Sequence, residues 1–518
     1  MPGKPQSGMD RPALDRPVSV VPVRLSDVAA QVNARIDDAG VGREVSATGI
    51  THSSGAVRSG DIYAGLPGAK RHGAEFAAAA EAAGAVAILT DERGADLAHE
   101  VALPRLVVAD ARAALGPVAS AVYGHPTHRL PVIGITGTAG KTSTAYLVES
   151  GLRAAGHRTC MIGTVETRIA ELVLDSERTT PEATDLHALF AVALEHGVTA
   201  AVMEVSSHAL TYERVGGVRF AVGGWTNFGL DHLDFHADVD DYFAAKAKLF
   251  DGRCRAEILN ADDAAVRRLA RDGRITYSAA GDPTATWRAA DVARDGFAQS
   301  FTALGPHGIR VAARVALPGL HNVANALLAI VCLVEAGVDP DTAAKGVAEC
   351  RGVPGRLELV DAPGPVLGVV DYAHKPDAIV AALAALREVA NGARVVSVIG
   401  AGGDRDRGKR PFMGEAAAAG ADMVIVTDDN PRTEDPAAIR ADVLRGASAG
   451  AIVIEVAGRR EAIVAAVRAA QPGDVIALLG KGHETGQEVG GALVPFDDRV
   501  ELARALTDRF HEHNGVRS

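Results

Sequence analysis

The chain has 518 residues, of which 47% are hydrophobic and 23% are charged, and its formal net charge is -12 at pH 7. This length exceeds what one hydrophobic core usually organises, so we expect three domains. The negative charge opposes the phosphate backbone of nucleic acid and excludes a broad nucleic-acid-binding surface. No run of about 18 apolar residues is free of charges, so no membrane span is expected.

The opening residues MPGKPQSGMDRPALDRP contain proline, glycine and charges but no apolar core. We therefore predict a flexible leader over residues 1–21 rather than a signal peptide. The four cysteines lie far apart without a CxxC pair, which favours reduced thiols: Cys160, Cys254, Cys332 and Cys350. These features predict a cytoplasmic protein, expected to be a monomer, that binds small molecules and neither nucleic acid nor membrane.

In chain order, the periodicity first indicates short strands, such as GAVAILTD, mixed with Ala-rich helices, up to the turn-rich joint YGHPTHRLP. Strands at PVIGIT and AAVMEVS and a helix near 239–250 then alternate until a second joint at RGVPGR. Beyond it, VLGVVDYAH, ARVVSVIG, ADMVIVTD, AIVIEVAG and DVIALLGKG are separated by amphipathic stretches. This alternation predicts an α/β fold that ends in a mostly parallel sheet with helices on both faces.

The segment GITGTAGKTST places a glycine-rich turn between a strand and a helix. In this arrangement backbone N–H groups cradle a phosphate, Lys141 neutralises it and the Thr142 hydroxyl can reach Mg²⁺. The match to GxxxxGK is imperfect because Ile135 fills the first glycine position, which leaves Gly137-x-x-Gly140 before the lysine. The pattern favours nucleotide binding, and an ordinary turn before a helix is the alternative.

Two further residues point to the same chemistry. Glu204 ends an apolar run, where a strand can deliver a carboxylate beside the phosphate loop; an exposed glutamate is the alternative. Lys246 lies in the middle of a helix's apolar face, and Lys248 points elsewhere. A buried amine loses its charge and can react with CO₂ to give a carbamate, an anionic metal ligand; snorkelling is the alternative.

A dozen motifs occur in the order and spacing of the Mur ligases, among them GTAGKTS, TTPEATDLH, MEVSSHAL, DHLDFH, YFAAKAKLF, HNVANALLAI, VPGRLE, VDYAHKPD, DDNPRTEDP and LLGKGHETGQ. The chain resembles this family from about 22 to 510. The resemblance implies a uridine-substrate domain (22–129), a central P-loop-type ATP-binding domain (130–351) and a C-terminal Rossmann-like amino-acid-binding domain (352–518).

The resemblance also implies an activity, an ATP- and Mg²⁺-dependent amide ligase of peptidoglycan precursor synthesis. ATP would phosphorylate the D-Glu carboxylate of UDP-N-acetylmuramoyl-L-Ala-D-Glu, and an amine of meso-diaminopimelate would attack the acyl phosphate. Phosphoryl transfer needs charge neutralisation and positioning. The implied catalytic residues are Lys141, Glu204, His232 and Lys246. The implied metal ligands are Thr142, Glu204, His232 and Lys246 as its carbamate.

For ATP, the resemblance implies contacts at Gly137, Thr138, Ala139, Gly140, Lys141, Thr142, Ser143, Asn322, Asn325, Arg356, Asp371, Tyr372 and His374. Read without the family, the two asparagines indicate helix caps and the aspartate a turn. For the nucleotide-sugar substrate it implies Ser54, His72, Gly73, Thr179, Thr180, Ser206 and Arg214.

The chain departs from the family in the uridine region. Ser53-Ser54-Gly55 stands where many members have Asp-Ser-Arg, and Tyr212 stands where many have Gln. The missing arginine leaves open which residue meets the uridine or diphosphate end. Arg58 and Lys70 are the candidates.

The tetrad Asp429-Asn430-Pro431-Arg432 marks, in this family, the enzymes that take meso-diaminopimelate, whereas relatives taking L-lysine lack the arginine. A guanidinium can bind the extra distal carboxylate with two parallel hydrogen bonds, and lysine would leave Arg432 unpaired. The resemblance adds Arg405, Gly480 and Glu484 to this site.

Other interpretations stay open at this point. DDNPRTED alone would indicate a capped turn. A ligase that adds L-lysine or ornithine is the nearest alternative function, followed by a folylpolyglutamate-type ligase. An ATP-hydrolysing binding protein without ligase activity is a third.

Overall fold

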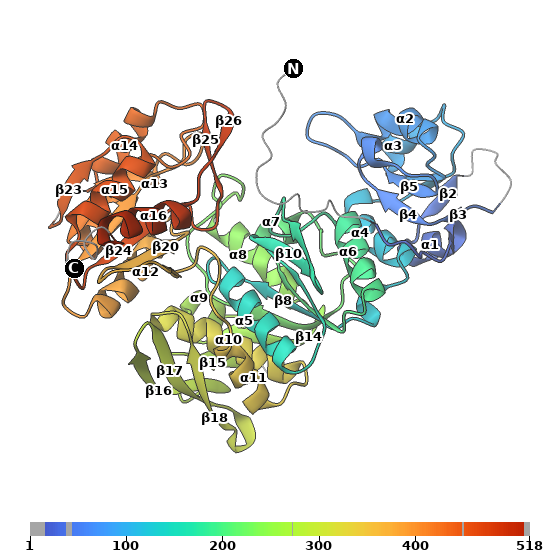
Figure 1. The fold of residues 1–518 in the computed structure, drawn as a ribbon. Helices are drawn as coiled ribbons and strands as arrows, with labels where there is room; N and C mark the ends of the chain where they lie inside the picture. The colour runs from blue at the N-terminus through green and yellow to red at the C-terminus, as the bar shows by residue number, and fades with distance from the viewer. Residues whose placement is uncertain (1–15, 38–43, 272, 448–449, 512–518) are drawn as a thin grey trace. The chain divides into compact units, whose positions relative to one another are not determined.

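The computed structural model describes residues 16–37, 44–271, 273–447 and 450–511. They belong to two compact units (Figure 1): one contains residues 10–277 and 328–346, and the other contains 278–327 and 347–518. Both units hold parallel strands flanked by helices, so the predicted α/β class is confirmed. None of the helices in the described ranges has the length and apolar character needed to cross a bilayer.

The first unit begins with a five-stranded sheet in the order β2-β7-β6-β5-β4, in which only the β2–β7 pair is antiparallel. Asp91 and Asp110 cap the helices that begin at Glu92 and Ala111, because their carboxylates accept from backbone amides of the first helical turn that have no other partner within the helix. Its strands, with the small β1–β3 pair, are β1 (Val23–Arg24), β2 (Arg35–Asp37), β3 (Ser46–Ala47), β4 (Gly49–Thr51), β5 (Asp61–Ala64), β6 (Ala87–Thr90) and β7 (Arg105–Val107). Its helices are α1 (Leu25–Val32), α2 (Ala77–Ala82), α3 (Glu92–Leu97) and α4 (Ala111–Val122).

The second sheet of this unit runs β11-β10-β9-β12-β8-β13-β14-β15 and is parallel from β9 to β15. Its strands are β8 (Val132–Thr136), β9 (Thr159–Ile162), β10 (Glu166–Ile169), β11 (Leu172–Asp175), β12 (Ala200–Glu204), β13 (Phe220–Trp225), β14 (Cys254–Asn260) and β15 (Ile275–Ser278). Its helices are α5 (Lys141–Ala154), α6 (Ala183–Glu195), α7 (Ser207–Thr211), α8 (Val239–Ala247), α9 (Ala264–Arg267) and α11 (Pro340–Ala348), which runs two residues past the unit's end.

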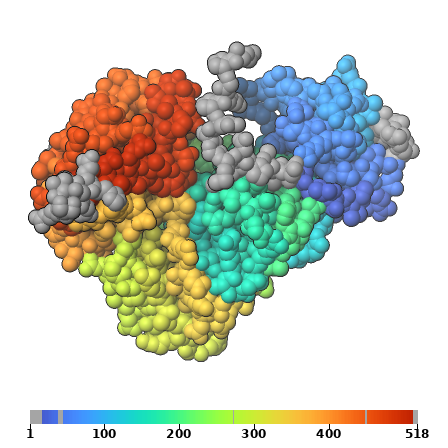
Figure 2. Space-filling model, viewed as in Figure 1, coloured from blue at the N-terminus to red at the C-terminus, as the bar shows by residue number. Residues whose placement is uncertain are grey.

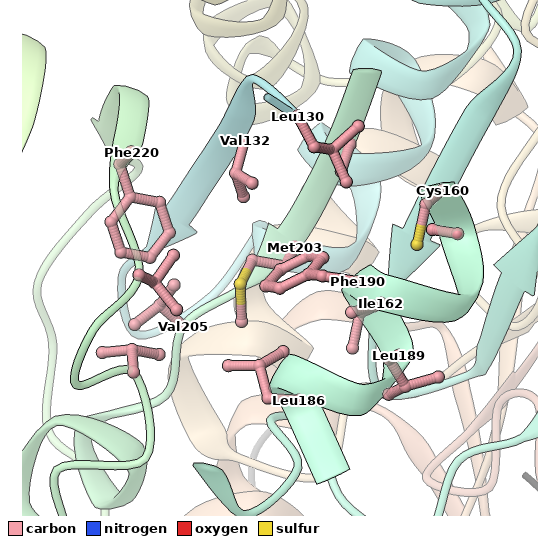
Figure 3. Packing of buried hydrophobic residues seen from close by; sticks show 14 of the residues in the cluster. Leu130, Val132, Cys160, Ile162, Leu186, Leu189, Phe190, Met203, Val205 and Phe220 are labelled. Atoms are coloured by element: carbon pink, nitrogen blue, oxygen red, sulfur yellow. The ribbon is translucent and has the colours of Figure 1, made fainter. Parts of the chain in front are cut away.

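Figure 3 shows how α6 covers this sheet. Phe190 on α6 and Met203 on β12 lie among Val132, Ile162 and Leu186, all of them fully buried. Burial of such side chains is worth roughly 1.5–3 kcal/mol each and fixes the central strand β8 between β12 and β13. The end of β8 is thereby held rigidly where the phosphate loop begins.

The second unit opens with the antiparallel strands β16 (Trp287–Asp295), β17 (Ala298–Leu304) and β18 (Arg310–Val315), which the sequence analysis did not anticipate. Helix α10 (Leu320–Glu335) begins in this unit and ends in the other. Residues of β18 alternate between exposed and buried, the pattern of a sheet with one face in water.

The C-terminal sheet runs β19-β20-β24-β21-β22-β23, and only β19 is antiparallel. All five predicted strands are present: β20 (Leu367–Asp371), β21 (Val395–Ile399), β22 (Met423–Val426), β23 (Ile452–Glu455) and β24 (Val475–Leu479). The remaining elements are β19 (Glu358–Val360), α12 (Pro376–Ala390), α13 (Lys409–Gly420), α14 (Pro436–Leu444), α15 (Arg459–Ala469), the hairpin of β25 (Gly486–Val489) and β26 (Ala492–Pro495), and α16 (Asp498–His511).

This sheet and its helices make up the orange and red part of the surface in Figure 2. Strands β20 and β21 are consecutive along the chain but are separated by β24 in the sheet. Ligands of open parallel sheets bind at such places, beyond the carboxyl ends of the strands.

The end of the predicted leader is ordered, contrary to expectation. The guanidinium of Arg16 donates to Asp61 at 2.7 Å, and the amides of Val18 and Ser19 donate to Glu195. Residues 1–15 lie outside the described residues. The sequence analysis missed this because the partners are far away along the chain.

Arg459 and Asp498 form a fully buried ion pair with two bonds, at 2.7 and 2.6 Å. We predict that Asp498→Ala lowers the free energy of unfolding by about 3–5 kcal/mol, because it leaves an uncompensated buried charge. Urea denaturation of the full chain measures this change. The control Asp295→Ala, which removes an exposed pair with Arg314, should cost less than about 1 kcal/mol. Equal losses in the two variants would contradict the prediction.

Candidate active site

The glycine-rich segment forms a tight loop between β8 and α5. Gly137 has a φ of 142°, and a Cβ added there would lie 1.8 Å from Thr226 Oγ1. Gly140 caps α5 with a left-handed φ of 83°. Lys141 Nζ folds back and donates to the carbonyl oxygens of Gly137 and Thr138 at 2.7 and 3.1 Å. The loop therefore needs both glycines of the incomplete motif.

Residues at the end of β13, which the sequence analysis missed, hold this loop. The Asn227 side chain accepts from the Ala139 amide and donates to the Ala139 carbonyl, both at 3.0 Å. Thr138 donates its amide to the Asn227 carbonyl, and Thr226 Oγ1 donates to Ala139. Thr142 and Ser143 are buried in the first turn of α5. Two polar residues directly after a buried strand, as in GGWTN, were the available signal.

Lys246 is buried with its amine against the phosphate loop. It is 1% exposed, its Nζ donates to the Gly137 carbonyl at 3.0 Å, and it lies 4.7 Å from the centre of the Tyr242 ring. Lys248 is partly exposed beside Glu213. The predicted burial is confirmed and snorkelling is excluded, because the amine does not reach water.

Glu204 is buried at the end of β12, in register with Ile135 of β8, so the alternative of an exposed glutamate is wrong. Its carboxylate accepts from the Thr164 amide at 2.8 Å and from the Thr164 hydroxyl at 3.1 Å. His232 lies on the loop between β13 and α8 and has a φ of 52°. Its Nε2 lies 3.0 Å from Asp231 Oδ2. Within the described ranges, no three His, Cys, Asp or Glu side chains gather as a metal site.

Four of the predicted nucleotide-sugar residues lie beside Glu204. Thr180 donates its hydroxyl to the Glu204 carbonyl at 2.9 Å and accepts from the Ser206 amide at 3.1 Å. Arg214 donates to the Thr180 carbonyl at 3.3 Å. Thr179 Oγ1 lies 3.0 Å from Thr164 Oγ1, and Thr164 in turn donates to Glu204.

Three arginines surround Glu182 next to this cluster. Arg214 lies 2.8 Å from its carboxylate, and Arg112 and Arg178 each lie 3.2 Å away. Burial lowers the pKa of Arg214, although Glu182 opposes the shift. Arg112 and Arg214 also face the ring of Tyr212, the residue that departs from the family. The surplus of positive charge suits an anionic group of a ligand.

The other three predicted residues lie on two segments next to strands of the N-terminal sheet, Ser54 after β4 and His72 and Gly73 after β5. His72 Nε2 lies 3.2 Å from Asp91, and its Nδ1 accepts from the Ala74 amide. Gly73 packs so tightly that an added Cβ would lie 2.8 Å from the Leu66 amide nitrogen. Ser54 begins a short 3₁₀ turn.

Around Gly55, where the family arginine is missing, a Cβ would meet nothing within 4 Å. Arg16 reaches this turn and donates to the Ala56 carbonyl at 2.9 Å. Arg58, one of the two candidates, donates its amide to Asp61. Arg16 is therefore a third basic residue near this position, which the sequence analysis overlooked.

The predicted ATP-binding residues of the second unit gather around Tyr372. The Arg356 guanidinium lies 4.5 Å from the Tyr372 ring centre, and His374 Nδ1 lies 2.7 Å from the Tyr372 carbonyl oxygen. Burial lowers the pKa of His374 to about 3, so the ring is neutral at pH 7. Asp371 at the end of β20 accepts from the amides of Leu357 and Ala373.

The two asparagines lie in the first turns of α10. Asn322 donates to the Pro318 carbonyl at 2.8 Å, and Asn325 donates to Asn322 Oδ1 at 3.2 Å. Both are buried. Both side chains donate in these bonds, whereas a helix cap accepts from a backbone amide, so the bonds do not support the capping interpretation. Contact with adenine or ribose stays a prediction.

The predicted amino-acid residues follow β21, β22 and β24 and meet beyond their carboxyl ends. Asn430 donates to Glu484 at 2.8 Å. Lys481, fully buried and missed by the sequence analysis, lies 3.1 Å from Asn430 Oδ1, 3.2 Å from Glu484 and 3.5 Å from Asp429. The loop with Arg405 is exposed.

Two glycines are needed in the same loops. Gly480 has a positive φ of 113°, which other residues rarely adopt. A Cβ on Gly403 would lie 2.0 Å from the Pro431 carbonyl oxygen. The ring of His483, next to Glu484, lies 5.1 Å from the Tyr372 ring, so the amino-acid residues adjoin the Tyr372 cluster.

Arg432 already has an internal partner. Its Nε donates to Glu488 Oε2 at 2.8 Å and its Nη1 donates to the Gly403 carbonyl at 2.6 Å. The expectation that Arg432 stays unpaired without a ligand carboxylate is therefore wrong. Glu488 is 56 residues away along the chain, on a hairpin that the sequence analysis did not predict.

Comparison with known proteins agrees with this geometry. Family profiles match in order at residues 46–123 (Mur ligase family, catalytic domain), 135–333 (Mur ligase middle domain) and 355–482 (Mur ligase, glutamate ligase domain). Each match lies inside one of the three predicted domains, whose exact boundaries stay predictions.

The chain is 50% identical over 508 residues to the UDP-N-acetylmuramoyl-L-alanyl-D-glutamate--2,6-diaminopimelate ligase of Streptomyces coelicolor, covering 96% of this chain and 99% of the relative. It is 47% identical to the ligase of the same name from Corynebacterium glutamicum, covering 91% and 94%. A solved structure of a ligase with that name is 32% identical, with a TM-score of 0.66, and covers 90% and 96%.

The phosphate loop beside a buried lysine fits a nucleotide-dependent enzyme, and the family matches and the names of the relatives give its class, the ATP-dependent ligases. Within that class, the chain belongs to the Mur ligase family.

We predict that Gly137→Ala weakens ATP binding at least about tenfold, because the new Cβ collides with Thr226 and displaces the loop amides. Isothermal titration calorimetry with a non-hydrolysable ATP analogue measures the effect. Gly156→Ala is the matched control, because Gly156 also has a positive φ but its Cβ would meet nothing within 4 Å. Equal affinities in the two variants would refute the steric argument.

Proposed function

We propose that this Mur ligase joins meso-diaminopimelate to the D-Glu carboxylate of UDP-N-acetylmuramoyl-L-Ala-D-Glu, with ATP as the energy source. The observation that carries the proposal is the position of Arg432, which follows β22 beyond the carboxyl ends of the C-terminal strands and bonds to Glu488. Glu488 donates its amide to Asn430, which also contacts Glu484 and Lys481. The names of the 50% and 47% identical relatives support the same substrate.

A carboxylate is a poor electrophile, so activation must precede amide formation. One oxygen of the D-Glu carboxylate attacks the γ-phosphorus of ATP, ADP leaves, and an acyl phosphate forms. The amine nitrogen then attacks the acyl carbon, loses a proton and expels phosphate. Because water would hydrolyse the acyl phosphate, the site must exclude it during the reaction.

The phosphate loop fits the nucleotide on two grounds. A Cβ at Gly137 would collide with Thr226, so the loop can pack this closely only with glycine at that position, and Lys141 lies folded over the loop with its amine beside the Gly137 and Thr138 carbonyls. Lys141 then neutralises the β- and γ-phosphates, which supports the transfer step.

Mg²⁺, when bound, would neutralise charge on the transferred phosphate. Thr142 and Glu204 offer oxygen ligands from adjacent elements, a hard donor set that suits this ion. We propose that His232 and the carbamate of Lys246 complete the set. The burial of Lys246 beside the Gly137 carbonyl supports the carbamate, because a buried amine gains from exchanging its charge for an anionic group that faces a cation.

The nucleotide-sugar substrate is proposed to bind along two groups of residues in the first unit. Ser54, His72 and Gly73 lie at the N-terminal sheet, and Thr179, Thr180, Ser206 and Arg214 lie beside Glu204. Asn322, Asn325, Arg356, Asp371, Tyr372 and His374 are proposed to bind adenine and ribose. Action as a cytoplasmic monomer is part of the same proposal.

In the amino-acid site, Arg432 is proposed to bind the distal carboxylate and Glu484 the distal ammonium, with Arg405, Asp429 and Gly480 around them. One observation favours the alternative of L-lysine: Glu488 neutralises Arg432, so lysine does not leave that charge unpaired. An ATP-hydrolysing binding protein is disfavoured, because a nucleotide switch does not need the charged and polar residues beyond the carboxyl ends of the C-terminal strands.

The proposal predicts a tripeptide product with meso-diaminopimelate and far less with L-lysine. The test measures phosphate release and product mass with ATP, Mg²⁺ and UDP-N-acetylmuramoyl-L-Ala-D-Glu, with each amino acid in parallel. Product with lysine alone would transfer the proposal to the lysine-adding alternative. Phosphate release that needs neither amino acid would support the binding protein.

A second prediction concerns Lys246. Lys246→Arg keeps the positive charge but cannot form a carbamate, so we expect product formation to fall at least about hundredfold, as expected when a transition-state charge stabiliser is lost. Lys248→Arg, two residues along and partly exposed, is the matched control and should retain activity. Full activity in Lys246→Arg would contradict the carbamate.

A further inference from the structure

One acidic side chain next to Arg432 has no assigned role. Glu488 lies on β25, and its carboxylate accepts from Arg432 Nε at 2.8 Å. The Glu488 side chain is 44% exposed, whereas that of Arg432 is 21% exposed. The acidic partner can thus move into water more easily than the arginine can.

The backbone fixes where this pair forms. Arg432 donates its amide to the Glu488 carbonyl at 2.9 Å and accepts from the Gly490 amide at 2.7 Å, so the loop runs beside β25 as a short parallel bridge. Glu488 donates its own amide to Asn430 Oδ1 at 3.0 Å. The main chain of Glu488 is therefore held in place, and only its side chain is free to change position.

The Arg432 guanidinium has two partners, and a ligand carboxylate can replace only one of them. Nη1 donates to the backbone carbonyl of Gly403, which cannot turn away without moving its loop. Nε donates to Glu488, whose carboxylate ends a rotatable side chain. A carboxylate that binds Nε and Nη2 with two parallel bonds needs the place that Glu488 occupies, and two carboxylates at one edge repel each other.

We infer that Glu488 occupies Arg432 in the free enzyme and is exchanged for the distal carboxylate of the incoming amino acid, so that Glu488 sets the discrimination between amino acids with and without that group. The inference rests on the proposed function. Diaminopimelate has to displace Glu488, whereas lysine leaves the internal pair intact. The Arg432–Glu488 pair therefore makes the preference for diaminopimelate over lysine smaller than it would be if Arg432 had no internal partner.

Glu488→Gln tests this exchange, because it removes the competing charge and keeps the shape. We expect the KM for meso-diaminopimelate to fall about two- to fivefold, the effect of an ion pair of this exposure. The kcat and the KM values for ATP and the nucleotide dipeptide should stay unchanged, and use of L-lysine should not improve. Glu488→Ala, as a second variant, should shift the ratio of diaminopimelate to lysine use in the same direction.

Glu455→Gln is the matched control. Glu455 is also 44% exposed and accepts from an arginine Nε, that of Arg440, at 2.7 Å, but it lies on the edge strand β23. It should leave every constant unchanged. In an Arg432→Ala background, Glu488→Gln should have no effect on the KM for diaminopimelate, because the residue through which it acts is gone.

An unchanged or higher KM for diaminopimelate in Glu488→Gln would overturn the inference while leaving the proposed function intact. Equal changes for diaminopimelate and lysine would assign Glu488 a structural role and also overturn it. Absence of any product with diaminopimelate in the wild-type enzyme would instead refute the proposed function, and the inference with it.

Discussion

The carbonyl oxygen of Gly137 accepts hydrogen bonds from the amines of both Lys141 and Lys246. If both amines were protonated they would repel each other, and in a buried position this repulsion would be stronger than in water. An anion beside them relieves it, either a phosphate at the loop or a carbamate on Lys246. The arrangement exists because β8 is followed directly by Gly137, at a φ that other residues rarely adopt, and because α8 presents Lys246 from its buried side.

The carboxyl end of β8 is also where other site residues of the first unit meet. Glu204 reaches it from β12 on one side, and Thr226 and Asn227 reach it from β13 on the other. Parallel strands deliver their carboxyl ends to one edge, so residues separated by up to 90 positions meet without a long loop. Bonds from Thr164 and Thr180 then tie Glu204 to the residues proposed to bind the nucleotide sugar.

In the second unit, too, parallel strands bring residues together at their carboxyl ends, but here these residues are mainly charged. Its charged groups are mostly paired with each other: Lys481 with Glu484 and Asp429, and Arg432 with Glu488. A site that is neutralised internally can remain folded before a zwitterionic amino acid arrives. The selectivity between two amino acids therefore depends on the free energy of the bonds that each ligand makes, minus the free energy of the internal bonds that it replaces.

The sequence by itself determined the parallel strands of the C-terminal sheet, the glycine loop, the α/β class and the burial of Lys246 and Glu204, because these follow from local periodicity and from motifs of contiguous residues. Only the tertiary structure decided which groups are partners. Asn227 on the phosphate loop, Arg16 near Gly55, Lys481 under Asn430 and Glu488 on Arg432 are contacts between distant segments. Pairing of side chains depends on strand order and hairpin placement, and neither leaves a local pattern in the chain.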